Sequence, residues 1–290
     1  MVMDCEYLKP KALEEALALI SQYKEESKII AGGQSLLVLI QEGLVKPNYL
    51  IDIKGVSALD YINFDKNEGL RIGSLTTHRA IETSPVIRNG FGVLCEMEEE
   101  VATIQIRNRG TIGGNICHAD PAGDPCPVLI ALNAKVKMAS LSGERTMSLE
   151  EFNKDYFESA LQDDDILTEV QVPITPPHTG SSYAKFRIAE RDSTLVATAA
   201  LITLNAKNEA CDNARIVLGG AAPIPLRVEK AEKLLLGAEV TDDLLEEVAQ
   251  IASEESSPIP DMSGSEEYKR ELVRILVKRV AKEALRLARC

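Results

Sequence analysis

The pattern of hydrophobic and polar positions predicts a mixture of helices and short strands in the first half of the chain. Between residues 11 and 26, apolar side chains recur on one face at helical spacing and predict an amphipathic helix. Short apolar runs bounded by turn residues predict strands. The remaining elements predicted here are strands at 28–31, 48–53 and 70–74 and helices at 35–43 and 84–102.

The second half of the chain favours an antiparallel sheet followed by helices. Ser142-Gly143 predicts the turn of a hairpin. Pro173 to Ser182 is rich in Pro, Gly and Ser, which predicts a linker. The segment 111–127 contains so many turn-forming residues that we expect no regular element in it. The other predicted elements are strands at 136–139, 145–148, 166–172, 183–188, 197–204 and 214–218 and helices at 226–236, 241–256 and 265–289.

These elements predict an α+β protein divided near residue 178. We expect a first domain over residues 1–177, with subdomains at about 1–55 and 56–177, and a second domain over 178–290. The last helix carries apolar positions at helical spacing, and we expect it to pack on its own domain, with contact to another subunit as the alternative.

Composition excludes several classes of protein. Apolar residues make up 45% and charged residues 27% of the 290 residues, as in ordinary globular proteins. The net charge of −13 and the low aromatic content argue against nucleic-acid binding. The sequence contains no apolar run that could span a membrane, and its start does not resemble a signal peptide, so we expect a cytoplasmic protein.

Two glycine pairs are the strongest candidates for ligand binding. The first lies in Ala31-Gly32-Gly33-Gln34-Ser35, between a predicted strand and a predicted helix, and the second lies in Thr111-Ile112-Gly113-Gly114-Asn115. Glycine lets the backbone approach a ligand and aim successive N–H groups at an anion. Two such loops would suit the pyrophosphate of a dinucleotide, although each pair could also be a simple tight turn. Neither pair matches the Rossmann or P-loop motifs.

Several longer stretches resemble one family. The segments are AGGQS at 31–35, QIRNRG at 105–110, TIGGNICHADPAGDPCPVL at 111–129, ILTEVQVP at 166–173 and ARIVLGGAAPIPLR at 214–227. Together they resemble the flavin subunit of the molybdenum hydroxylases, the family of xanthine dehydrogenase, carbon monoxide dehydrogenase and nicotinate dehydrogenase. The resemblance extends over nearly the whole chain.

The resemblance implies both a fold and a role. The fold is a two-subdomain FAD-binding domain of the vanillyl-alcohol-oxidase-like (PCMH) type, followed by a C-terminal domain with a small antiparallel sheet and helices. The role is electron transfer by a non-covalently bound FAD to NAD⁺ or another acceptor. An iron–sulfur small subunit would carry two [2Fe–2S] clusters and a large subunit the molybdopterin, in a dimer of heterotrimers. No side chain of this chain is then needed as a catalytic group.

The resemblance also assigns cofactor-binding residues by position. It places Asp124, Lys185 and Asp192 near the flavin and Leu167 near the adenine. The residues implied for the first glycine loop, which meets the pyrophosphate, are Ala31, Gly32, Gly33, Gln34, Ser35 and Leu36. Those implied for the second loop are Thr111, Gly114 and Asn115, with His118 beside them. Gln34 departs from the histidine of many carbon monoxide dehydrogenase subunits, which weakens an assignment to that substrate.

Each of these residues also has a simpler interpretation. Asp124 could cap a turn, Lys185 could be a solvated residue of an edge strand, and the charges from Arg187 to Asp192 could form a solvated face. His118, Asp120 and Asp124 lie between Cys117 and Cys126, but their spacing matches no ordered set of metal ligands. We therefore predict no metal site, and we expect the six cysteines to remain thiols.

Two other functions remain open from the sequence. The chain could be a nucleotide-binding or FAD-binding scaffold without redox activity, or a stand-alone flavin oxidase. The region after the linker is short for the substrate domain that such an oxidase carries. The substrate oxidised by a complex would be chosen on another subunit, so this sequence does not reveal it.

Overall fold

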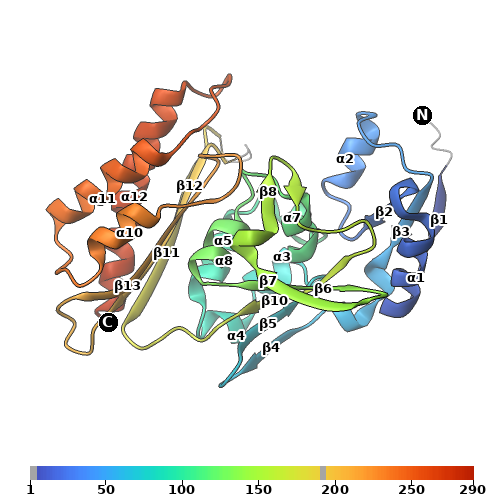
Figure 1. The fold of residues 1–290 in the computed structure, drawn as a ribbon, viewed down its shortest axis with the longest axis horizontal. Coiled ribbons are helices and arrows are strands. Elements are labelled where there is room, and N and C mark those ends of the chain that lie inside the picture. Colours follow the sequence, from blue (N-terminus) through green and yellow to red (C-terminus); the bar gives the residue numbers. More distant parts are fainter. Residues whose placement is uncertain (1–4, 190–193) are drawn as a thin grey trace.

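The computed structural model describes residues 5–189 and 194–290, which form three bodies arranged in a row (Figure 1). The first body is a three-stranded parallel sheet in the order β1-β3-β2. Ala16, Leu17 and Ile20 on one face of α1 pack against this sheet, so the predicted amphipathic helix is present. The elements are β1 (Glu6–Leu8), α1 (Leu13–Tyr23), η1 (Lys24–Glu26), β2 (Ser27–Ile30), α2 (Leu36–Gln41) and β3 (Tyr49–Asp52).

The second body is built on a five-stranded antiparallel sheet in the order β4-β5-β10-β6-β7. Its strands are β4 (Ile62–Asp65), β5 (Gly69–Gly73), β6 (Lys135–Ser140), β7 (Gly143–Ser148) and β10 (Ile166–Val172), with a small pair β8 (Asn153–Asp155) and β9 (Glu158–Ser159). Its helices are α3 (His78–Glu82), α4 (Pro85–Arg88), α5 (Gly92–Glu100), α6 (Ile104–Arg107), α7 (Ile112–His118), α8 (Pro125–Ala131) and α9 (Leu149–Phe152). All of these helices except α6 share one large apolar core with the sheet. The short helices η2 (Ile53–Gly55) and η3 (Ser57–Leu59) precede this body and pack in the core of the first.

The third body combines a four-stranded antiparallel sheet with three helices. All nine residues of β12 are buried, because α12 covers one face of the sheet and α8 of the second body lies against the other. The last helix packs on its own domain, as predicted. The elements are β11 (Thr179–Phe186), β12 (Val196–Leu204), β13 (Cys211–Gly219), β14 (Leu226–Arg227), α10 (Glu229–Leu235), α11 (Asp242–Glu255) and α12 (Glu266–Ala288).

Three predictions about local structure were wrong. The helix expected over 84–102 is interrupted, because the chain turns after Arg88 and buries Phe91 in the core before α5 begins. The segment 111–127 contains two helices, α7 and α8, where none was expected. The linker expected over 173–182 ends early, because β11 begins at Thr179, whose hydroxyl lies 2.8 Å from that of Thr203 on β12.

The helices in segment 111–127 form because their ends are stabilised locally. Thr111 caps α7, and its Oγ1 accepts a hydrogen bond of 3.2 Å from the N–H of Gly114. Pro125 occupies the first turn of α8, where a missing N–H has no cost. The turn-forming residues therefore mark the helix ends and the connection between them. None of the helices within the described ranges is long and apolar enough to cross a membrane.

Candidate functional site

The first glycine loop, residues 31–36, leaves the carboxyl end of β2 and leads into α2. Gly33 has a φ of +75°, a left-handed conformation that favours glycine. Within the described ranges, no group accepts a hydrogen bond from the N–H of residues 32, 33, 34, 35 or 36. Gly32, Gly33 and Ser35 are half-buried, and Gln34 is exposed. A run of free N–H groups around a left-handed glycine can bind an anion, because each donor would otherwise lack a partner.

The second glycine loop, residues 111–115, has a different hydrogen-bond pattern. The N–H groups of Ile112 and Gly113 donate to the carbonyl oxygens of Thr76 (3.0 Å) and Ser74 (2.9 Å). Those of Gly114 and Asn115 donate to Thr111, at its hydroxyl and its carbonyl oxygen respectively. This loop therefore offers a ligand its shape and side chains rather than a row of free N–H groups.

The two glycine loops touch each other across the seam between the first and second bodies. A Cβ built on Gly32 would lie 2.2 Å from the carbonyl oxygen of Arg109 and 2.7 Å from the Cα of Gly110. A Cβ built on Gly114 would lie 3.9 Å from the Cβ of Ala31. The structure thus brings together two motifs about 80 residues apart, and only glycine at position 32 permits this approach. The free backbone N–H groups of the first loop, beside this seam, are donors of the kind that bind an anionic phosphate.

Asp124 lies at the start of α8, at the boundary between the second and third bodies. Its carboxylate accepts three hydrogen bonds of 2.7 Å, from Tyr183 Oη, Lys185 Nζ and Thr194 Oγ1. Asp124 and Lys185 are both almost completely buried, with side-chain exposures of 8% and 4%. Burial and the nearby charge of Asp124 raise the pKa of Tyr183 well above its ordinary value, so this phenol donates rather than ionises.

The structure therefore joins Asp124 and Lys185, two residues predicted to lie near the flavin, in a buried ion pair. Lys185 is not the solvated edge residue of the simpler interpretation. The pair connects the second body to the third, and neither side chain is a freely accessible ligand group in this arrangement.

Two further cations of the third body pair with carboxylates of the second body. Arg187 pairs with Glu100 at 2.9 Å and Arg227 with Glu150 at 3.6 Å. The charges expected from Arg187 onward as a solvated face thus include a domain contact. Asp192, also predicted at the flavin, lies outside the described residues.

The other predicted site residues make contacts within the second body. His118, the last residue of α7, stacks at a tilt on Phe157 with ring centroids 5.2 Å apart. Leu167 is buried in β10 within the core of the second body, so its side chain has a packing role. Cys117 and Cys126 are thiols whose pKa burial raises to about 12, and the described residues include no cluster of three or more potential metal ligands.

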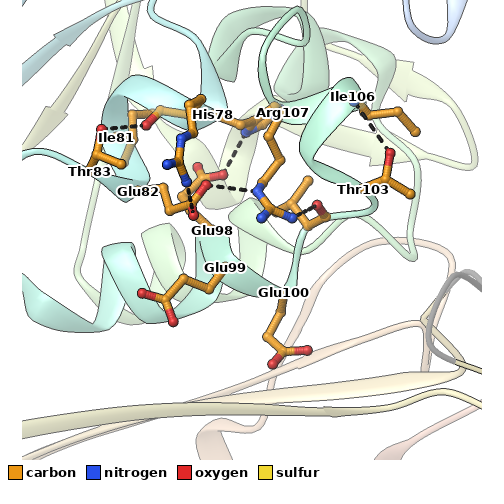
Figure 2. Close-up of polar contacts among 12 residues, drawn as sticks. His78, Ile81, Glu82, Thr83, Glu98, Glu99, Glu100, Thr103, Ile106 and Arg107 are labelled. Atoms are coloured by element: carbon orange, nitrogen blue, oxygen red, sulfur yellow. Dashed lines mark hydrogen bonds and ion pairs between the residues drawn. The ribbon is translucent and has the colours of Figure 1, made fainter.

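The sequence analysis missed a buried polar network beneath the second glycine loop. His78 Nδ1 lies 2.8 Å from Oε2 of the fully buried Glu98 (Figure 2). Beside this pair, Arg107 Nε donates to Glu82 at 2.8 Å, and Arg79 also pairs with Glu82. No sequence signal identified Glu98, because it lies in an acidic run on α5 that is typical of a solvated helix face.

Comparison with known proteins matches each of the two parts of the chain to a known domain family. Residues 3–175 match the family model of the FAD binding domain in molybdopterin dehydrogenase, and residues 181–284 match that of the CO dehydrogenase flavoprotein C-terminal domain. A carbon monoxide dehydrogenase structure from Hydrogenophaga pseudoflava superimposes with a TM-score of 0.95 at 31% identity and covers all of both chains.

Curated relatives show the same correspondence along the chain. The 6-hydroxypseudooxynicotine dehydrogenase complex subunit alpha of Paenarthrobacter nicotinovorans is 34% identical, over 98% of this chain and 95% of its own. The nicotinate dehydrogenase FAD-subunit of Eubacterium barkeri is also 34% identical, over 96% of this chain and 95% of its own. Because family models match both parts of the chain and relatives 34% identical cover nearly all of it, the chain belongs to the family of FAD-binding medium subunits of the molybdenum hydroxylases.

Proposed function

We propose that this chain holds FAD as the electron-transfer subunit of a cytoplasmic molybdenum hydroxylase. In this role, electrons from [2Fe–2S] clusters on a small subunit pass through the flavin to NAD⁺ or another acceptor, and a large subunit with molybdopterin oxidises the substrate. The assembly proposed is a dimer of heterotrimers. The bound flavin supplies the redox chemistry, and this chain binds and orients it.

The observation that carries the proposal is the run of free N–H groups in the first glycine loop. Five consecutive donors, residues 32–36, have no partner in the part of the chain that the structure describes, and residues 3–175 match a FAD-binding domain. Hydrogen bonds to a charged acceptor are stronger than neutral ones. We propose that these N–H groups bind the FAD pyrophosphate and that Thr111, Gly114 and Asn115 form the facing wall.

The flavin end of the proposed site lies where the FAD-binding domain contacts the C-terminal domain. Helix α7 begins at the second glycine loop, and the segment that follows it ends at Asp124. A seven-residue helix such as α7 spans roughly 10 Å. A dinucleotide is long enough to cover this distance. We propose that the flavin lies toward the Asp124–Lys185 pair, which holds the two domains in a constant relative position.

We expect FAD to be bound without a covalent link. The proposed contacts are hydrogen bonds from the backbone, which are lost when the chain unfolds. Acid precipitation of the purified yellow chain should release its absorbance near about 450 nm into the supernatant. Colour that remains in the washed pellet would contradict this prediction, and a chain that never takes up FAD would support the redox-inactive scaffold instead.

We also expect the isolated chain to depend on partners for its reducing equivalents. Reconstituted with FAD, it should oxidise NADH with an artificial dye, but purines, aldehydes and carbon monoxide should leave its flavin oxidised. Adding the cluster and molybdenum subunits should make flavin reduction depend on the substrate, as followed by bleaching of the flavin absorbance. Reduction of the flavin by any of these substrates in the isolated chain would favour a stand-alone oxidase.

A further inference from the structure

A series of contacts connects a buried ion pair to Gly110, just before the second glycine loop, and to Gly32 in the first. His78, the first residue of α3, donates its N–H to the carbonyl oxygen of Gly110 at 3.0 Å. Its ring lies against the same residue, because a Cβ on Gly110 would be 3.0 Å from His78 Cδ2. The other side of Gly110 contacts Gly32. Glu98, His78, Gly110 and Gly32 thus follow one another from the core to the proposed phosphate site.

The Glu98–His78 pair is more than a packing contact. Oε2 of Glu98 faces His78 Nδ1, whereas Oε1 is buried and has no hydrogen-bond partner among the described residues (Figure 2). A buried carboxylate is costly unless a positive charge or a proton compensates it. Two apolar side chains of similar volume would fill the same space without this cost. Packing alone therefore does not account for a charged pair at this position.

A proton shared by this pair compensates the carboxylate. Burial opposes the charged form of His78, but the charge of Glu98 and its hydrogen bond outweigh that effect and raise the pKa of His78 above its ordinary 6.5. Burial also raises the pKa of Glu98, against the attraction of His78. The other charged groups facing the pair are Arg107 on α6, Glu82 on α3 and Asp124 at the start of α8.

We propose that His78 is a positioning residue for the FAD pyrophosphate, and that the proton it shares with Glu98 couples FAD affinity to pH. The inference rests on the proposed placement of FAD at the glycine loops. With the proton bound, the pair is neutral as a unit and His78 supports Gly110 and, through it, Gly32. Without the proton, an uncompensated carboxylate remains behind the loops and disfavours an anionic ligand.

The direction of the coupling follows from linkage. A group whose pKa is raised in the folded chain is protonated at low pH and loses its proton as the pH rises through that raised value. FAD affinity should therefore be highest below this value and fall as the pH rises through it. Because coupling between two binding events is reciprocal, FAD binding should also be accompanied by proton uptake.

The test measures FAD affinity of the full chain, freed of flavin, by quenching of FAD fluorescence from about pH 6 to about pH 9. We expect the dissociation constant of the wild type to rise about fivefold to tenfold across this range, as is typical of coupled sites. Glu98→Gln keeps the volume and a hydrogen bond but removes the charge, and its dissociation constant should be independent of pH. Both proteins bind the same FAD, so any titration of FAD itself cancels in the comparison.

A neighbouring residue on α5 provides the matched control. Glu99→Gln removes a carboxylate that is 54% exposed and pairs with Arg88, and it should retain the wild-type pH profile. Calorimetric titration of the wild type in buffers of different ionisation enthalpy should show proton uptake on FAD binding, and Glu98→Gln should abolish it. If Glu98→Gln does not fold, as judged by circular dichroism, the double variant His78→Gln with Glu98→Gln, which removes both titratable groups, takes its place with the same expected result.

The outcomes separate this inference from the proposed function. A wild-type chain that binds FAD with the same affinity at every pH and without proton uptake would overturn the inference alone. A wild-type pH profile in Glu98→Gln, or in the double variant that replaces it, would also overturn it. A chain that binds no FAD at any pH would overturn the proposed function together with the inference.

Discussion

Gly32→Ala is expected to weaken FAD binding by at least about a hundredfold, equivalent to the loss of two charge-assisted hydrogen bonds. The added Cβ would lie 2.2 Å from the carbonyl oxygen of Arg109 and 2.7 Å from the Cα of Gly110. Both neighbours are backbone atoms of the two residues that lead into the second glycine loop, and they cannot rotate away as a flexible side chain would. The two loops must separate, and the N–H groups of the first loop then no longer converge on one anion. Fluorescence titration with FAD measures the effect.

Gly90→Ala is the matched control for this prediction. No atom lies within 4 Å of a Cβ built at position 90, between α4 and α5. This variant should bind FAD as the wild type does, and both variants should retain the wild-type circular-dichroism spectrum. Wild-type FAD affinity in Gly32→Ala would show that the glycine pair is an ordinary turn and that the pyrophosphate lies elsewhere.

Asp124→Asn is expected to destabilise the chain by about 3–5 kcal/mol, the usual cost of breaking a buried ion pair by removing one partner. The amide would still accept hydrogen bonds at one oxygen, but Lys185, with 4% of its side chain exposed, would remain as an uncompensated buried cation. The effect should appear as a lower urea midpoint of unfolding, followed by circular dichroism.

A double variant separates the charge effect from packing. Asp124→Asn combined with Lys185→Met removes both charges and should recover most of the lost stability. A double-mutant cycle with the two single variants measures this coupling. Asp242→Asn breaks an exposed pair with Lys282 and should leave the urea midpoint unchanged. Equal loss of stability in the single and double variants would mean that Asp124 acts through its hydrogen bonds to Tyr183 and Thr194 rather than through charge.

The long elements could be predicted from the sequence because their signals are local. In α12, apolar residues recur at helical spacing over 23 residues, and the face they form is the face that packs on the sheet. In β12, a continuous run of small and apolar residues predicts a strand, and the structure buries all nine of its residues. The glycine pairs and their neighbouring residues were specific enough to indicate the family, with its FAD-binding domain.

The short helices were harder to predict because a few residues carry little helical signal. An isolated turn of helix is unstable, so contacts with the rest of the chain decide whether it forms. In the segment 111–127, the same residues that suggest an irregular loop cap α7 and begin α8. Capping is a local signal that the density of Gly, Pro and Asp concealed.

By itself, the sequence determined the secondary structure of the longer elements, the glycine motifs and the family, because each depends on residues close together in the chain. Only the tertiary structure decided which distant groups meet. It placed Gly32 against Gly110, joined Asp124 to Lys185 across a domain boundary, and buried Glu98 beside His78. Each contact spans 20 or more residues, and the burial that gives it its electrostatic effect arises only when the bodies pack together.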